Sequence, residues 1–206
     1  MLLRFYDVTE GSITVGGEDI RQVLQADLRG KIGYVPQKGQ LLAGTIASNI
    51  RYGKPSATDD EVREAASVAQ ALGFIEEKDG GFGAEIAQGG GNVSGGQRQR
   101  LSIARALAKN PEILVFDDSF SALDFQTDAK LRQALKQHTA NATVIVIAQR
   151  VGTIMGAEQI IVLDEGRIVG RGTHEELLGT CPAYYEIASS QGAADRGLRD
   201  KPFALS

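Results

Sequence analysis

Cysteine, long apolar runs and runs of basic residues are scarce in this sequence, and each absence excludes a class of protein. Cys181 is the only cysteine among the 206 residues. An intrachain disulfide and a CxxC metal or redox site are therefore excluded, and a reducing compartment is the natural setting. The longest apolar runs, such as residues 144–148, reach only about five residues, whereas a membrane-spanning helix needs about 20. No bilayer-spanning segment is predicted within the chain.

The charge balance argues against a nucleic-acid partner. Lysine and arginine total 22 and aspartate and glutamate total 26, so the formal net charge is −4. No polybasic run is present. A mildly acidic chain has no general attraction to DNA or to an anionic membrane surface. Glycine, by contrast, is abundant at 25 residues without a collagen period, which indicates many turns and close backbone approaches.

Hydrophobic patterning predicts an α/β domain. Short, continuous apolar runs are typical of strands buried on both faces of a parallel sheet. We expect strands over 33–35, 113–116, 144–147 and 160–163, and helices over 60–72, 94–109, 126–138 and 173–190. This order favours a mostly parallel sheet flanked by helices. We expect one domain over 1–190, with a helical subdomain inserted at about 45–91, and a disordered tail over 191–206.

The strongest local signal is the segment Val93-Ser94-Gly95-Gly96-Gln97, which precedes an amphipathic helical pattern. Ser94 followed three residues later by Gln97 fits a capping box that starts a helix. Two glycines in the first turn, however, cost roughly 1 kcal/mol each relative to alanine. Glycines leave the first helical N–H groups approachable at the positive end of the helix dipole, which suits a phosphate group. Both interpretations remain open from the residues alone.

This segment resembles the signature motif of ABC ATPases, and the resemblance continues through residues 96–107. It implies a P-loop NTPase-like fold with ATP and Mg²⁺ as cofactors. It also implies that Ser94, Gly95, Gly96 and Gln97 contact the γ-phosphate of an ATP held by the opposite subunit, so that the motif acts in trans.

Residues 113–118, Ile-Leu-Val-Phe-Asp-Asp, form an apolar strand pattern that ends in two carboxylates. A carboxylate at the carboxyl end of a parallel strand can hold Mg²⁺ beside bound phosphates. After the signature segment, this run resembles the Walker B motif. The resemblance implies that Asp117 binds Mg²⁺ and that Asp118 is the general base, which orients or deprotonates the attacking water.

Three other segments resemble family motifs that are weak by themselves. Residues 34–37 resemble the Q-loop, which implies that Gln37 senses Mg²⁺ and the attacking water and relays to the membrane part. Residues 121–124 resemble the D-loop, which passes between subunits, and Asp124 is also a plausible helix cap. Residues 148–150 lie at the family's switch motif, which implies that Gln149 faces the γ-phosphate.

The resemblance covers residues 3–191 and points to the exporter branch, the lipid and multidrug exporters, through segments 4–8, 44–46 and 49–53. It implies two partners, namely a second ABC subunit and the transmembrane domain of a parent transporter. It also implies a location on the cytoplasmic face of the membrane. The transported substrate is not readable from the sequence, because the membrane helices select it.

The sequence departs from the family pattern in two respects. First, it has no G-x-x-x-x-G-K-[ST] run, the Walker A loop that holds the β- and γ-phosphates. We therefore expect a C-terminal fragment, without the family's opening strands, that alone binds ATP poorly and does not hydrolyse it. Second, the family usually has Glu at position 118 and His at position 149, whereas Asp118 and Gln149 stand here. This pair resembles the degenerate site of heterodimeric exporters.

Two alternatives belong to other classes. ABC-type ATPase heads of DNA repair and chromosome condensation share the signature and Walker B motifs but carry a long coiled coil before the signature. Only 57 positions separate Gln37 from Ser94 here, without sustained heptads. A non-enzymatic relic or regulatory fragment is the other alternative, and the missing Walker A loop keeps it open.

Overall fold

The structure is a computed structural model that describes residues 1–193. The chain divides into two compact units, Met1–Ile147 and a second unit that begins at Ala148. Within the described part, no helix combines the length and apolar character needed to cross a membrane. Most of the expected tail, residues 194–206, lies outside the described residues. Its first residues, 191–193, are described as part of the second unit, and Ala193 is buried there.

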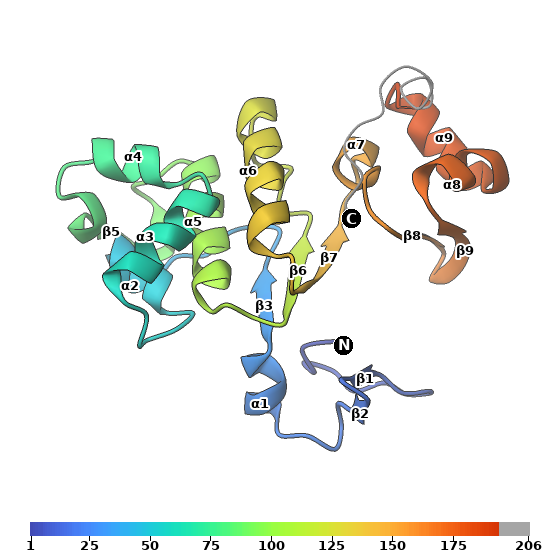
Figure 1. Cartoon of the computed structure of the whole chain (residues 1–206), viewed down its shortest axis with the longest axis horizontal. Helices are drawn as coiled ribbons and strands as arrows, with labels where there is room; N and C mark the ends of the chain where they lie inside the picture. The colour runs from blue at the N-terminus through green and yellow to red at the C-terminus, as the bar shows by residue number, and fades with distance from the viewer. Residues whose placement is uncertain (194–206) are drawn as a thin grey trace. The chain divides into compact units, whose positions relative to one another are not determined.

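A parallel three-stranded sheet is the centre of the first unit (Figure 1). Its strands stand in the order β3 (Ile32–Val35), β6 (Ile113–Asp117) and β7 (Thr143–Ile147). β3 and β7 each pair in parallel with β6. Three of the four predicted strands therefore lie in this parallel sheet, and the mixed α/β class is confirmed.

The prediction that every strand is buried on both faces is wrong for β7. Val144, Ile145 and Ile147 are 41%, 38% and 50% exposed. Among the described residues β7 is one of the two outer strands of its sheet and pairs only with β6, so its side chains have less cover than those of β6. A continuous apolar run predicts a strand, but the tertiary environment decides how deeply that strand is buried.

Helices gather on one side of this sheet (Figure 1). They are α2 (Ile46–Arg51), α3 (Asp59–Val68), α4 (Leu72–Glu77) and the 14-residue α5 (Gly95–Ala108), with the short strand pair β4 (Gly44–Thr45) and β5 (Glu85–Ile86) beside them. The predicted helix over 60–72 ends earlier, at Val68, because Gln70 takes a left-handed backbone conformation with φ of 56°. The expected helix over 94–109 is confirmed.

The core of the first unit joins these helices to the sheet. Its largest fully buried side chains include Ile46, Ile50, Leu101, Ile103 and Phe116. The helix α6 (Phe125–His138) adds Leu131 and Leu135 to the same core and agrees with the predicted helix over 126–138. Burial of such side chains supplies about 1.5–3 kcal/mol each, so the core fixes the strand ends that carry the candidate site.

A smaller cluster covers the beginning of the sheet. The hairpin β1 (Thr14–Val15) and β2 (Glu18–Asp19) leads into α1 (Gln25–Gly30). Ile20, Leu28 and Ile32 pack there against Val115 of β6.

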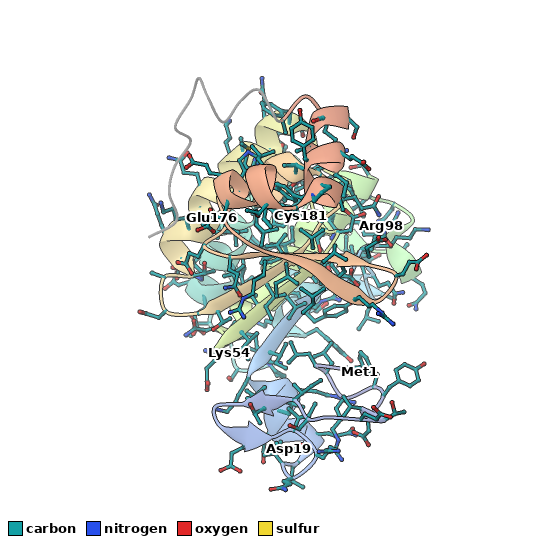
Figure 2. The ribbon with its side chains drawn as sticks, turned by 90° about the vertical axis from the view of Figure 1, so that its right-hand side faces the viewer. Met1, Asp19, Lys54, Arg98, Glu176 and Cys181 are labelled. Atoms are coloured by element: carbon teal, nitrogen blue, oxygen red, sulfur yellow. The ribbon has the colours of Figure 1, made fainter. Side chains whose placement is uncertain are left out.

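The second unit is built around an antiparallel hairpin. It contains α7 (Val151–Ile154), β8 (Ile160–Asp164), β9 (Arg167–Gly172), α8 (His174–Thr180) and α9 (Pro182–Ser190). The predicted strand over 160–163 is present, but β8 pairs antiparallel with β9 and does not join the parallel sheet. The single helix predicted over 173–190 is two helices. The break falls at the buried Cys181 (Figure 2), because Pro182 lacks an N–H and starts a new helix.

A buried histidine makes the stability of this unit depend on pH. The ring Nδ1 of His174 lies 2.8 Å from the Tyr184 hydroxyl, and Nε2 is buried without a protein partner among the described residues. Burial lowers the pKa of His174, against a smaller opposing effect of Glu175. Burial also raises the pKa of Tyr184 to about 12.

We expect this unit to lose stability as the pH falls below about 6.5, the ordinary histidine pKa. The folded pKa of His174 is below its unfolded value, so the unfolded chain takes up the proton more readily. His174→Gln keeps an acceptor for Tyr184 without titrating. Urea unfolding at pH 7.5 and 5.5 is expected to show a lower midpoint at acid pH in the wild type and a smaller change in the variant. An equal change in both proteins would contradict this assignment.

Candidate functional site

Polar side chains meet at the carboxyl ends of the neighbouring strands β3 and β6. The Tyr34 hydroxyl donates a hydrogen bond of 2.9 Å to Oδ2 of Asp117, the last residue of β6. The side-chain amide of Gln37, in the loop after β3, donates one of 3.1 Å to Oδ2 of Asp118. The structure therefore brings Gln37, Asp117 and Asp118 together, as their positions after parallel strands imply.

The turn after β6 is held from both sides. Asp118 has φ of 45°, a left-handed conformation that aspartate tolerates better than most residues. Its N–H donates to the Ile147 carbonyl at 2.8 Å. The fully buried hydroxyl of Ser119 donates to the Val35 carbonyl at 2.8 Å. These bonds connect the turn to β7 and β3, so the backbone that carries the Asp118 side chain is held in place.

Tyr34 remains a hydrogen-bond donor in this arrangement. Burial raises the pKa of the Tyr34 phenol, and the hydrogen bond to Asp117 and its charge act in the same direction. The phenol is therefore protonated at neutral pH and donates its hydrogen bond to the Asp117 carboxylate.

The donor set suits Mg²⁺ bound together with phosphates. Mg²⁺ uses one or two protein carboxylates and takes its other ligands from water and substrate phosphates. Asp117 supplies the carboxylate. The NH₂ of Gln37 is engaged with Asp118, so its amide oxygen is the atom suited to a cation. Within residues 1–193 no group of three or more histidine, cysteine, aspartate or glutamate side chains forms a metal cage, which is compatible with this mode of binding.

The N-terminus of α5 is closed by the predicted capping box. The Ser94 hydroxyl accepts from the Gln97 N–H at 3.2 Å, and the Gln97 side chain accepts from the Ser94 N–H at 3.0 Å. Helix geometry leaves the N–H groups of Gly95 and Gly96 without an intrahelical acceptor. Because α5 is 14 residues long, the positive end of a full helix dipole lies behind them.

Packing within the chain does not explain the two glycines. A Cβ added to Gly95 would meet no atom within 4 Å, and one added to Gly96 would only touch the Ala122 carbonyl oxygen at 3.5 Å. Neither glycine has a positive φ. The open space over this helix end is therefore available to something outside the chain.

Asp124 begins the next helix and lies in the loop that approaches Gly96 through Ala122. Its carboxylate accepts from the Thr127 N–H at 2.9 Å and caps α6. Hydrogen bonding to the backbone of Thr127 lowers the pKa of Asp124. The helix-cap role is confirmed, whereas its role between subunits remains a prediction.

Gln149 belongs to the second unit. Its carbonyl accepts a hydrogen bond of 2.8 Å from the side chain of Gln191, whose amide oxygen also accepts from the Val151 N–H at 2.9 Å. The backbone around Gln149 is therefore anchored within that unit.

Sequence reasoning missed the polar residues of α5 that hold the neighbouring loops. Gln99 is 1% exposed and binds the loop of Gln37. Arg105 donates to the carbonyl groups of Gln40 and Asn49 at 2.8 and 2.9 Å. A signal exists for Gln99, because it precedes the buried Ile103 by four residues and so shares the core face of the helix.

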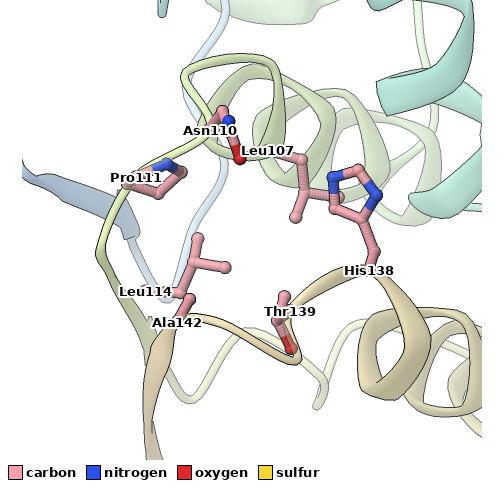
Figure 3. A pocket seen from close by; sticks show the side chains of 7 residues that line it. All are labelled: Leu107, Asn110, Pro111, Leu114, His138, Thr139 and Ala142. Atoms are coloured by element: carbon pink, nitrogen blue, oxygen red, sulfur yellow. The ribbon is translucent and has the colours of Figure 1, made fainter.

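A small pocket lies at the other end of β6 (Figure 3). Leu107, Leu114 and His138 are among the side chains that line it, with Leu114 near the start of the strand that Asp117 ends. It is therefore separate from the candidate site.

The family model for the ABC transporter matches residues 1–121, more than half of the chain. The chain belongs to the ABC transporter family. Similar relatives are an uncharacterized ABC transporter ATP-binding protein of Mycobacterium tuberculosis, 50% identical over 194 residues, and the ATP-dependent lipid A-core flippase of Desulfotalea psychrophila, 48% identical over 178 residues. These matches cover 93% and 86% of this ABC chain and 33% and 31% of the relatives.

A putative multidrug export ATP-binding/permease protein of Staphylococcus aureus is 42% identical over 191 residues, which are 93% of this chain and 33% of that protein. A bacterial Atm1-family ABC exporter solved with ATP bound is similar in structure, with a TM-score of 0.90 and 41% identity. That match covers 93% of this chain and 34% of the exporter. This ABC chain therefore spans about a third of the length of the proteins it matches.

Proposed function

We propose that this chain is part of the ATP-binding domain of an ABC exporter and that the start of α5 acts on ATP held by a second subunit. The open helix end carries the proposal. A Cβ added to Gly95 would meet no atom within 4 Å, and one added to Gly96 would make only an ordinary contact with the Ala122 carbonyl oxygen. The N–H groups of both glycines lie at the positive end of α5. A γ-phosphate approaching from another subunit would find these donors and the Ser94 hydroxyl.

The residues at the strand ends would form the chain's own nucleotide site. Asp117 and Gln37 would hold Mg²⁺, which supplies charge neutralisation to the phosphates when bound. Asp118 would orient the attacking water, and Gln149 would donate a hydrogen bond to the γ-phosphate. Asp124 would contribute at the boundary between subunits.

Two substitutions support a slow site in this chain. Asp118 is one methylene shorter than the usual glutamate, and a misplacement of about 1 Å can cost about 10²-fold in rate. Its carboxylate is also bound to the Gln37 amide. Gln149 carries neither the charge nor the titrating proton of histidine. We therefore propose a heterodimer in which the partner subunit carries the faster site.

The relatives favour export across a membrane as the process that this ATPase drives. Two of them are named for lipid A-core flipping and multidrug export. By this proposal the chain works at the cytoplasmic face beside the transmembrane domain of the parent transporter, with no nucleic-acid partner.

Without a Walker A run, the 206-residue chain alone is expected to show no ATP hydrolysis. The test is a single-turnover assay with radiolabelled ATP and Mg²⁺ at high protein concentration, with the assembled transporter as the positive control. Product formation by the chain alone would contradict the expectation. Absence of ATPase activity in the assembled transporter would instead favour a non-enzymatic role.

A further inference from the structure

We propose that Gln99 is a positioning residue that fastens the loop carrying Gln37 to the signature helix α5. This inference rests on the proposed function for its catalytic consequence. The structural part, a hydrogen-bonded clamp between α5 and the loop, is independent of that function.

The clamp consists of two hydrogen bonds from one buried amide. Gln99 Oε1 accepts from the Gly39 N–H at 2.8 Å, and Gln99 Nε2 donates to the Pro36 carbonyl at 3.0 Å. Pro36 and Gly39 flank the exposed residues Gln37 and Lys38. One side chain therefore fixes both ends of the short segment that presents Gln37, and it satisfies two backbone groups that would otherwise be left unpaired.

Close packing reinforces the clamp. A Cβ on Gly39 would lie 2.9 Å from the Arg98 carbonyl oxygen and 3.1 Å from Gln99 Oε1. Since real side chains essentially never approach backbone so closely, only glycine lets the loop lie against α5 at this point. Arg105 adds a second tie two turns further along the helix, through its 2.8 Å hydrogen bond to the Gln40 carbonyl.

The consequence is a direct connection between two parts of the molecule with different tasks. The start of α5 offers N–H groups outward, whereas Gln37 holds Asp118 at the chain's own strand ends. Because Gln99 lies on α5 five residues after Ser94, any shift of the helix that follows nucleotide contact at its start is passed to Gln37. Gln99 thus acts through Gln37 and touches no nucleotide itself.

A double-mutant cycle in the assembled transporter tests this route. Gln99→Met keeps the side-chain length and removes both hydrogen bonds, so kcat for ATP is expected to fall about tenfold or more, with KM within about twofold. In a Gln37→Ala background the same substitution is expected to change kcat by less than about twofold, because the residue it acts through is gone. Ser102→Ala, at another buried position of α5, is the control and should leave kcat unchanged. Equal fold losses in both backgrounds would overturn the proposal.

Amide hydrogen exchange in the 206-residue chain tests the clamp without any ATPase assay. The Gly39 amide is expected to be protected in the wild type and to exchange at least about tenfold faster in Gln99→Met. The Leu42 amide donates a hydrogen bond of 2.9 Å to Asn49 Oδ1, and its exchange rate should not change in this variant.

Gly39→Ala disrupts the same contact from the loop side, and the amide of residue 39 should then exchange faster in the same way, even if Gln99→Met folds poorly. An unprotected Gly39 amide in the wild type would overturn the clamp. If the Gly39 amide is protected but the assembled transporter has no ATPase activity, the clamp is supported and the proposed function is contradicted.

Discussion

Ser94→Arg in this chain is expected to abolish ATP turnover by the assembled transporter, with a fall of at least about 10²-fold. Loss of one preorganised donor at a developing charge costs about 10²–10³-fold. The arginine removes the hydroxyl that accepts from the Gln97 N–H and fills the open space over Gly95 and Gly96. Steady-state phosphate release by the purified transporter measures the effect.

Thr58→Arg is the matched control for the lost helix cap. Thr58 caps α3 with the same type of capping box, in which its hydroxyl accepts from the Glu61 N–H at 3.2 Å and its own N–H donates to Glu61 at 2.8 Å. Both variants should lose about 1 kcal/mol of stability, but Thr58→Arg should retain turnover. Similar losses of turnover would show that the Ser94 effect is only structural.

Asp118→Asn provides the comparison within the chain's own site. By the proposed asymmetry this site is slow and the partner's site carries most of the turnover. The amide is therefore expected to reduce the rate by less than about tenfold, well below the effect of Ser94→Arg. Equal losses from the two substitutions would argue against the asymmetry.

Gly53→Ala is expected to destabilise the first unit by about 3 kcal/mol or more, the upper range for overpacking a tight contact. A Cβ at Gly53 would overlap the backbone carbonyl oxygen of Arg105 in α5. Backbone cannot rotate away as a side chain does, so α2 and α5 would have to separate along a core that contains Ile50 and Leu101. Urea unfolding of the chain measures the change.

Gly73→Ala is the control for this substitution. Gly73 lies in the first turn of α4, and an added Cβ there would meet nothing within 4 Å. Alanine should leave stability unchanged or raise it by up to about 1 kcal/mol. A loss below about 1 kcal/mol at Gly53, against a typical overpacking cost of 1–3 kcal/mol, would show that the two helices do not pack as closely as described.

Local signals predicted much of this structure. The capping box at Ser94 and the cap at Asp124 depend only on residues within three positions, and both are present. The apolar runs of β3, β6 and β7 predicted strands because each run is continuous and too short for a typical helix. The carboxylates at the end of β6 and Gln37 in the loop after β3 lie close together because neighbouring parallel strands end at the same edge of the sheet.

Long-range contacts could not be predicted in the same way. The arginines of α5 occupy positions between the apolar ones, and their spacing alone does not indicate their partners. Arg100 lies with its guanidinium 4.7 Å from the centre of the Phe74 ring and donates to the Gln70 carbonyl at 2.7 Å. Burial of this side chain lowers its pKa. The folded structure decides which distant carbonyl a long side chain reaches. The same holds for Gln99, whose partner Pro36 lies 63 residues away in the sequence.

The most direct test of action in trans is to determine which subunit traps nucleotide. The assembled transporter is incubated with photoreactive ATP, Mg²⁺ and vanadate, irradiated, and the labelled subunit is identified. We expect label on the partner subunit, and its loss when this chain carries Ser94→Arg but not Thr58→Arg. Label confined to this chain, or trapping on the partner that Ser94→Arg leaves unchanged, would contradict the account.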